Sequence, residues 1–233
     1  TKCIRKYLNK QRILRGTNFK IMFTKDFLIA LNNWQNGWEE NQERKKKILD
    51  ELVLQCESIN SKYKTVNGPC YRKRFIRAGE VVPLLLNNYL DEGITSWSLN
   101  LEDTKDFKGH RYYFEDTKFA MVFKHHPIKK QILLNTKLLW NDPDFVKAAE
   151  TLKLSDKNSV KALFNFKDTQ SEVILEAPLR GTEIEYIIGM SGSFDELFER
   201  SGIDESKREE ISLAFAQKKE GILVECPTFT PEN

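Results

Sequence analysis

Apolar residues near the start of the chain recur at steps of three and four, the spacing that places side chains on one face of an α-helix. A first stripe consists of Phe27, Leu28, Leu31, Trp34 and Trp38. A second stripe consists of Ile48, Leu49, Leu52, Val53, Cys56 and Ile59. Residues 39–47, between the stripes, hold only charged and amide side chains with acids ahead of bases, which is typical of an exposed helical face. The pattern predicts that residues 1–64 are mainly helical.

The pattern changes after the turn signal Asn67-Gly68-Pro69. Short apolar and β-branched runs follow, bounded by polar or turn-forming residues, and each is predicted to be a strand. These runs are Cys70–Ile76, Ile94–Leu99, Phe119–Phe123, Ile132–Leu134, Ala162–Phe166, Glu172–Leu175 and Glu183–Ile188.

Helices are predicted between these strands and after them. Val81–Leu90 and Phe145–Leu154 have helical spacing, and Pro83 is then expected in the first turn, where its missing N–H does no harm. The C-terminal elements are predicted to be a helix opened by the capping-box pattern Ser193–Glu196, a helix from Asp204 to about Lys218, and a strand at Ile222–Val224.

Helices first and short mixed strands afterwards predict an α+β fold. We expect one domain over residues 1–233, with an N-terminal helical part (1–64), a catalytic β core (65–190) and a C-terminal extension (191–233). The hydrophobic fraction of 40% is enough for a core, and the 30% of charged residues belong to a surface. A net charge of +3 without a clustered basic stripe does not by itself indicate a nucleic-acid binder.

The cysteines and histidines point away from metal sites. None of the four cysteines is paired at Cys-x-x-Cys spacing, so reduced thiols are the expected state. The three histidines, His110, His125 and His126, lack partners at metal-ligand spacing, and no metal is expected. No apolar run reaches about 18 residues and no signal peptide is recognised. We therefore expect no membrane partner and a cytoplasmic site of action, in the producing or the target cell.

Three short segments carry candidate chemistry. Gln170 and Glu172 lie two apart at the mouth of a predicted strand and so point to the same side. By the same spacing, Ser96 and Ser98 share a face of Ile94–Leu99, with Trp97 opposite and Thr95 beside them. Taken singly, each segment is also explained by an ordinary polar strand edge.

The third segment is Cys70–Ile76, where Arg72 and Arg74 share a face. A guanidinium offers a fixed fork of donors that matches phosphate oxygens, so either arginine can hold a pyrophosphate. A basic edge strand without a ligand explains the pair equally well.

An arginine strand, a Ser-x-Ser strand and a Gln-x-Glu strand in this order resemble the Arg–Ser–Glu signature of the ADP-ribosyltransferase superfamily. Tyr71-Arg72 matches its aromatic–Arg motif, although the Gly that often follows is missing, which leaves Arg72 and Arg74 as alternatives. Ile94–Ser98 matches its Thr-Ser-x-Ser motif, with Trp97 in place of the usual Thr. Gln170–Leu175 matches its third motif.

The third match continues beyond the strand, through Pro178 and Gly181 to the closing strand from Glu183. The resemblance covers roughly residues 20–190. A second Glu-x-Glu pair, Glu183 and Glu185, lies in that closing strand and is interpreted as structural.

The resemblance implies an ADP-ribosyltransferase-like split β-sandwich with NAD, the substrate, in the cleft between two small sheets. Arg72 (or Arg74) would hold the pyrophosphate, Ser96 would position Glu172, and Thr95 and Ser98 would belong to the NAD site. Glu172 would stabilise the oxocarbenium-like transition state as nicotinamide leaves.

Gln170, with the preceding loop at about Asp156–Thr169 and its Phe164 and Phe166, would meet the acceptor. In this family a Gln at that place disfavours arginine as acceptor, and both protein and nucleic acid remain open. The implied protein is a mono-ADP-ribosyltransferase of the toxin or phage–host conflict type, with an inhibitory or antitoxin partner. The alternatives are an NAD glycohydrolase, which would not need Gln170, and an inactive binding module with the same fold.

Overall fold

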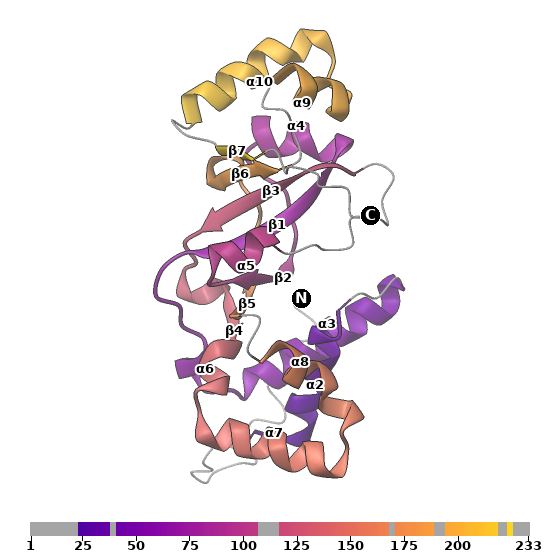
Figure 1. Ribbon diagram of the computed structural model, residues 1–233, viewed down its shortest axis with the longest axis vertical. Coiled ribbons are helices and arrows are strands. Elements are labelled where there is room, and N and C mark those ends of the chain that lie inside the picture. Colours follow the sequence, from indigo (N-terminus) through magenta and orange to yellow (C-terminus); the bar gives the residue numbers. More distant parts are fainter. Residues whose placement is uncertain are drawn as a thin grey trace, which may run out of the picture.

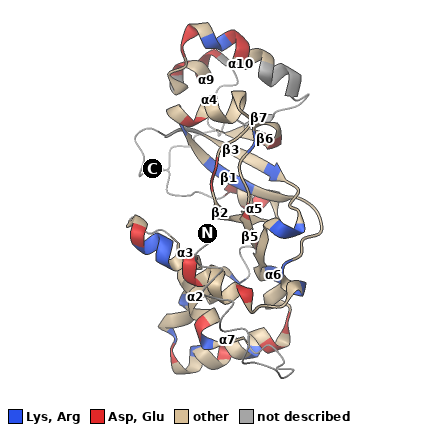
Figure 2. Cartoon of the chain, turned by 180° about the vertical axis from the view of Figure 1, so that it is seen from behind, with Lys and Arg blue, Asp and Glu red and all other residues tan. Residues whose placement is uncertain are grey.

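The computed structural model describes residues 23–37, 41–106, 117–167, 171–188, 194–218 and 223–225. Helices lie at both ends of an elongated molecule, and a mostly antiparallel sheet lies between them (Figure 1). The α+β class predicted from the sequence is confirmed. Both signs of charge alternate along α3 (Gln42–Glu57), α7 (Pro143–Ser155) and α10 (Glu205–Lys218) (Figure 2), as expected of exposed helical faces.

The N-terminal helices begin at side-chain caps. Thr24 Oγ1 accepts a hydrogen bond from the Phe27 amide at 3.1 Å and starts α2 (Lys25–Gln35), and Asn41 does the same for α3. The first apolar stripe is buried at Phe27, Leu28 and Leu31. The predicted helical structure is confirmed over α2 and α3. Residues 1–22 and Trp38 lie outside the described residues.

Seven strands follow one another in the sheet in the order β4-β5-β2-β1-β3-β6-β7. Their bounds are Cys70–Arg77 (β1), Ile94–Ser98 (β2), Thr117–His125 (β3), Ile132–Asn135 (β4), Glu172–Glu176 (β5), Ile184–Ile188 (β6) and Leu223–Glu225 (β7). All pairings are antiparallel except β6 with β7. Between β1 and β2 the register holds a single pair, Tyr71 with Ser98. The sheet therefore consists of two parts, β4-β5-β2 and β1-β3-β6-β7, that meet at that pair.

Strand β5 separates two hydrophobic cores, because its side chains alternate between the faces of the sheet. Val173 and Leu175 pack into a core with Trp97 and α4 (Ala78–Leu86). Ile174 points the other way, into a core formed with α2, α3, α7 and α8 (Lys161–Phe166). Glu172 is two residues before Ile174 and therefore faces the N-terminal helices.

The C-terminal helices belong to the first of these cores. Leu197 and Phe198 of α9 (Phe194–Ser201) and Ile211 of α10 are buried in one cluster with Val81 and Leu84 of α4. Helix α10 has the predicted extent, and Ser193 lies outside the described residues. The C-terminal extension thus shares its core with the sheet.

The shorter elements complete the described chain. They are η2 (Ser61–Tyr63), α5 (Leu101–Asp106), η4 (Lys129–Gln131), α6 (Thr136–Trp140), η5 (Asn158–Val160) and η6 (Gly181–Glu183).

Two sequence predictions are wrong. Ala162–Phe166, predicted as a strand within an acceptor loop, is helix α8, which buries the consecutive residues Ala162 and Leu163 and donates the Ala162 amide to Asn32 Oδ1 at 2.9 Å. Periodicity does not separate helix from strand in so short an apolar run. Helix α4 begins at Ala78, so Pro83 lies inside it and not in its first turn. The Glu80 carboxylate accepts from the Arg77 amide at 3.0 Å and starts the helix earlier than expected.

Candidate functional site

Glu172 is the first residue of β5, and the residue is 4% exposed. Its main chain is held from one side by Thr136 of α6, whose hydroxyl donates to the Glu172 carbonyl at 2.9 Å. Ser98 of β2 lies directly opposite in the antiparallel register. Ser96 is the diagonal neighbour on the same face, within reach of the carboxylate.

Three uncharged donors converge on the Glu172 carboxylate. Ser96 Oγ donates to Oε1 at 2.5 Å, and Trp34 Nε1 donates to the same oxygen at 3.1 Å while lying 3.2 Å from Ser96 Oγ. Gln35 Nε2 donates to Oε2 at 2.8 Å. A buried carboxylate requires such donors, because it has lost its hydration and can only accept. The two donors from α2 and one from β2 fix both oxygens in place.

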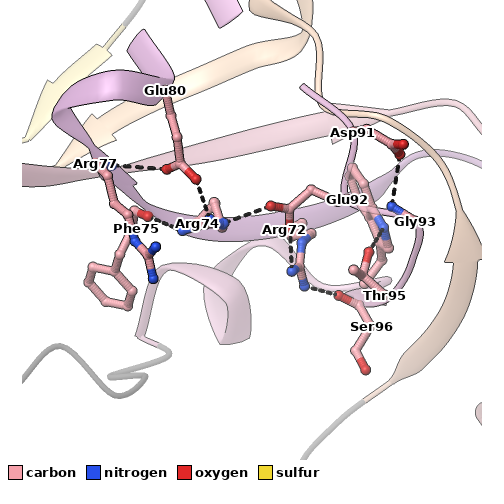
Figure 3. A network of polar contacts seen from close by, with 11 residues as sticks. Arg72, Arg74, Phe75, Arg77, Glu80, Asp91, Glu92, Gly93, Thr95 and Ser96 are labelled. Atoms are coloured by element: carbon pink, nitrogen blue, oxygen red, sulfur yellow. Dashed lines mark hydrogen bonds and ion pairs between the residues drawn. The ribbon is translucent and has the colours of Figure 1, made fainter. Parts of the chain in front are cut away.

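Arg72 of β1 joins this group through the main chain of Ser96. Its Nη1 donates to the Ser96 carbonyl at 2.8 Å, and its Nη2 pairs with Glu92 Oε2 at 2.8 Å (Figure 3). The arginine thus crosses the junction where β1 and β2 share only one registered pair. Arg72, Ser96 and Glu172, far apart in sequence, form one chain of direct hydrogen bonds.

Glu92 lies in the tight turn that precedes β2. Gly93 has a φ of +62°, a left-handed conformation that favours glycine, and its amide donates to Asp91 Oδ1 at 3.0 Å. The turn aims Glu92 at β1, where its other oxygen accepts from Arg74 Nε at 2.8 Å. Burial alone would raise the pKa of Glu92, but Arg72 and Arg74 together outweigh it and hold that pKa below its usual range.

Arg74 is bound by two carboxylates. Besides Glu92 it pairs with Glu80 at 2.8 Å through Nη2, and Nη1 donates to the carbonyl of Phe75 (Figure 3). Burial works against its charge, yet the two acids raise the pKa of Arg74. Arg72 has one carboxylate, and its Nε is buried with no hydrogen-bond partner. The two arginines therefore differ: Arg74 is paired with Glu80 and shares Glu92, whereas Arg72 has only the shared Glu92 and keeps an unused donor.

The hydroxyls of the remaining candidate residues, Thr95 and Ser98, are bonded to groups other than the carboxylate. Thr95 Oγ1 accepts from Trp97 Nε1 at 3.1 Å on the opposite face of β2. Ser98 Oγ accepts from the Asn100 amide at 3.0 Å and caps the turn after the strand. Gln170 lies outside the described residues.

Sequence reasoning missed three residues of this site. Trp34 belongs to the apolar stripe of α2, and that stripe predicted packing rather than hydrogen bonding. Nothing near Gln35 marks it as functional. Glu92 had a usable signal, an acid at the mouth of a hydroxyl-bearing strand that follows an arginine strand. All three become visible only when α2 and the β1–β2 connection are placed against the sheet.

A second polar cluster lies beside Trp97, on the opposite face of the sheet from Glu172. His125 Nδ1 is 2.9 Å from Glu183 Oε1, and its Nε2 is 3.2 Å from Gln131 Oε1. Burial lowers the pKa of His125, but the hydrogen bond to Glu183 and its charge outweigh burial, and the net pKa is raised. Glu185 pairs with Lys124 at 3.4 Å. These contacts agree with a structural role for Glu183 and Glu185.

Other chemistry is limited within the part of the chain that the structure describes. It holds no group of three or more His, Cys, Asp or Glu side chains placed to bind a metal ion. Cys56 and Cys70 are free and buried, and burial raises the pKa of each thiol to about 12. None of the helices among these residues is long and apolar enough to cross a membrane.

Comparisons with known proteins leave the site to be interpreted from its own geometry. The chain matches no family model, and neither the curated proteins nor the solved structures contain a protein found to be similar to it.

Proposed function

We propose that this chain is an ADP-ribosyltransferase, which breaks the bond between nicotinamide and ribose in NAD and transfers ADP-ribose to a macromolecule. One observation carries the proposal: the three residues of the Arg–Ser–Glu pattern are linked by hydrogen bonds from Arg72 to the Ser96 carbonyl and from Ser96 Oγ to Glu172. The sequence pattern alone does not require these contacts. Their presence supports a functional pattern over three unrelated strand residues.

The proposed reaction uses Glu172 as an electrostatic partner. As the bond from ribose C1′ to the nicotinamide nitrogen breaks, nicotinamide leaves with the electron pair and positive charge spreads over C1′ and the ring oxygen. A carboxylate already fixed by Ser96, Trp34 and Gln35 stabilises that charge without reorganising. An acceptor nucleophile then bonds to C1′ and loses its proton. Oxocarbenium-like chemistry beside a carboxylate is also the basis of glycoside hydrolysis.

Arg72 is the better of the two arginines for the pyrophosphate. The two side chains are exposed to a similar degree, 20% for Arg72 and 22% for Arg74, but Arg72 is paired with one carboxylate, whereas Arg74 is paired with two. A phosphate oxygen would compete with one carboxylate at Arg72 and with two at Arg74. Arg72 would also tie NAD binding to the Ser96 strand, because the same guanidinium holds the Ser96 carbonyl.

The acceptor is proposed to approach from the side of Gln170, two residues before Glu172. We propose that the acceptor is a protein or a nucleic acid within a cytoplasm. The chain would then be a mono-ADP-ribosyltransferase of the toxin or phage–host conflict type, and an antitoxin-like partner would inhibit the enzyme. Water as the acceptor would make the chain an NAD glycohydrolase.

Incubation with NAD labelled in its adenylate half tests the proposal. The protein is mixed with a cell lysate, and parallel samples are treated with protease or with nuclease before separation. Label on a macromolecule supports the transferase, and the treatment that removes it identifies the acceptor class. Free ADP-ribose alone means a glycohydrolase, and unchanged NAD means a binding module. Glu172→Gln is the matched control, since it removes the charge and keeps the shape.

A further inference from the structure

Gln35, the last residue of α2, has one half of its amide group occupied and the other half unused. Its Nε2 donates to Glu172 Oε2 at 2.8 Å. Its Oε1 is buried and has no hydrogen-bond partner, and the residue is 7% exposed. The orientation of the amide is dictated by chemistry, because the carboxylate only accepts and must face the NH₂ group. The unpaired atom is therefore a carbonyl oxygen.

A buried acceptor without a donor is costly and uncommon in folded proteins, and each one requires a physical explanation. A ligand that donates to Gln35 Oε1 supplies that explanation. Among the described residues, Glu172 Oε2, beside it, accepts one hydrogen bond, whereas Oε1 accepts two. An ionised carboxylate has about four lone-pair positions, so Oε2 keeps room for another donor. Trp34 and Ser96 are half-buried, so the group borders solvent on their side.

An unpaired amide oxygen, Gln35 Oε1, and a carboxylate oxygen with room for another donor, Glu172 Oε2, thus lie next to each other. Gln35 Nε2 is hydrogen-bonded to Glu172 Oε2, and Gln35 Oε1 is bonded to the same amide carbon as Gln35 Nε2. Neighbouring acceptors of this kind fit a pair of vicinal hydroxyl groups, each donating to one oxygen. The ribose that bears nicotinamide in NAD carries such a pair at its 2′ and 3′ positions.

We propose that Gln35 is a ligand-binding residue whose amide oxygen accepts a hydrogen bond from one hydroxyl of the nicotinamide ribose while Glu172 accepts from the other. The inference rests on the proposed function, because it takes NAD as the ligand. It adds that α2 recognises the sugar directly and does not only hold Glu172 in position.

The test combines NAD analogues with substitutions. Calorimetry gives the dissociation constants of NAD and of its 2′-deoxy and 3′-deoxy forms, altered in the nicotinamide ribose. Wild-type protein is expected to bind the deoxy form that loses the contact to the Gln35 amide roughly 3- to 10-fold more weakly than NAD, the worth of one neutral hydrogen bond. The form that loses the contact to the Glu172 carboxylate is expected to bind roughly 10- to 150-fold more weakly, because that hydrogen bond is to a charged group. In Gln35→Met, which keeps the shape and removes the acceptor, one of these penalties is expected to disappear while the other remains.

Trp34→Phe is the matched control. It removes another donor from Glu172 and leaves the Gln35 amide oxygen unchanged, so both penalties are expected to persist. If both penalties also persist in Gln35→Met, the amide oxygen binds no ribose hydroxyl and the inference is overturned. Should Gln35→Met not fold, the wild-type data decide, because a deoxy form bound as tightly as NAD overturns the inference by itself. Failure of the wild-type protein to bind or consume NAD would instead refute the proposed function.

Discussion

Replacing Arg72 and Arg74 one at a time by alanine separates structural support from ligand binding. Both arginines lie on the same face of β1 and share Glu92, and their side chains are 20% and 22% exposed. Arg74→Ala removes two ion pairs, to Glu80 and Glu92. Arg72→Ala removes one ion pair and the bond to the Ser96 carbonyl. The structure therefore predicts opposite orders for the effects of the two changes on stability and on NAD binding.

The magnitudes follow from these contacts. Hydrogen bonds to charged groups contribute about 1.5–3 kcal/mol each, and partial exposure places these near the lower limit. At about 1.5 kcal/mol each, we expect Arg74→Ala, which loses hydrogen bonds to Glu80, Glu92 and the Phe75 carbonyl, to lower the free energy of unfolding by about 4.5 kcal/mol. Arg72→Ala, which loses two such bonds, is expected to lower it by about 3 kcal/mol. For NAD affinity the order is reversed: loss of a charge-assisted phosphate contact in Arg72→Ala weakens binding roughly 10- to 150-fold. Arg74→Ala, which removes no ligand contact, is expected to stay within about threefold of wild type.

Urea unfolding at neutral pH and calorimetric titration with NAD measure the two quantities on the same preparations. A larger loss of NAD affinity in Arg74→Ala than in Arg72→Ala would assign the phosphate contact to Arg74. Equal losses in both variants would show that NAD binding follows stability alone, and the distinction between the arginines would be refuted.

Three further predictions concern Glu172, Gln170 and His125. The free energy of unfolding of Glu172→Ala, measured with urea, is expected to be about 3 kcal/mol lower than that of Glu172→Gln. Alanine leaves the donors to the carboxylate unpaired, whereas in Glu172→Gln the Gln35 amide can turn and accept from the new glutamine; equal free energies of unfolding would contradict this. Gln170→Ala is expected to lose labelling of the acceptor but to release nicotinamide at the wild-type rate, and equal losses would place Gln170 in the NAD site instead. The pKa of His125 is raised above its ordinary 6.5 by Glu183, so the stability from this pair is fully present below pH 6.5 and is lost as pH rises through the folded-state pKa. His125→Gln should flatten that part of the urea-stability profile, and an unchanged profile would show that the pair carries no pH dependence.

The elements with clear periodicity were predictable from the sequence. Strands around Arg72, Ser96 and Glu172 were recognisable as short runs of apolar and β-branched residues bounded by polar or turn-forming residues. That Ser96 and Glu172 share a face follows from the register of β2 on β5, which the sequence does not contain. The sequence also does not reveal that the Ser98 hydroxyl caps the next turn, since that depends on the chain leaving the strand at Asn100.

The contacts made by α2 could not be predicted, because they depend on where the helix docks. Helical spacing places Trp34 and Leu31 on one buried face, but only packing against β5 puts the indole N–H on a carboxylate. The error at Ala162–Phe166 has the same origin, as its apolar residues fit either period until α2 covers them. The contacts of the site therefore depend on how distant elements pack together, and not on the local helix or strand propensity of the sequence.

The release of nicotinamide from NAD is the most direct test of the claim that Glu172 serves the glycosidic bond of NAD. Initial rates are measured with wild type and Glu172→Gln at equal concentrations, after circular dichroism has shown that both are folded. The account predicts release that depends on the protein and falls on the order of 100- to 1000-fold in Glu172→Gln, the usual effect of removing one electrostatic partner of the transition state. Release at similar rates from both proteins, or no release by wild type with its acceptor present, would contradict it.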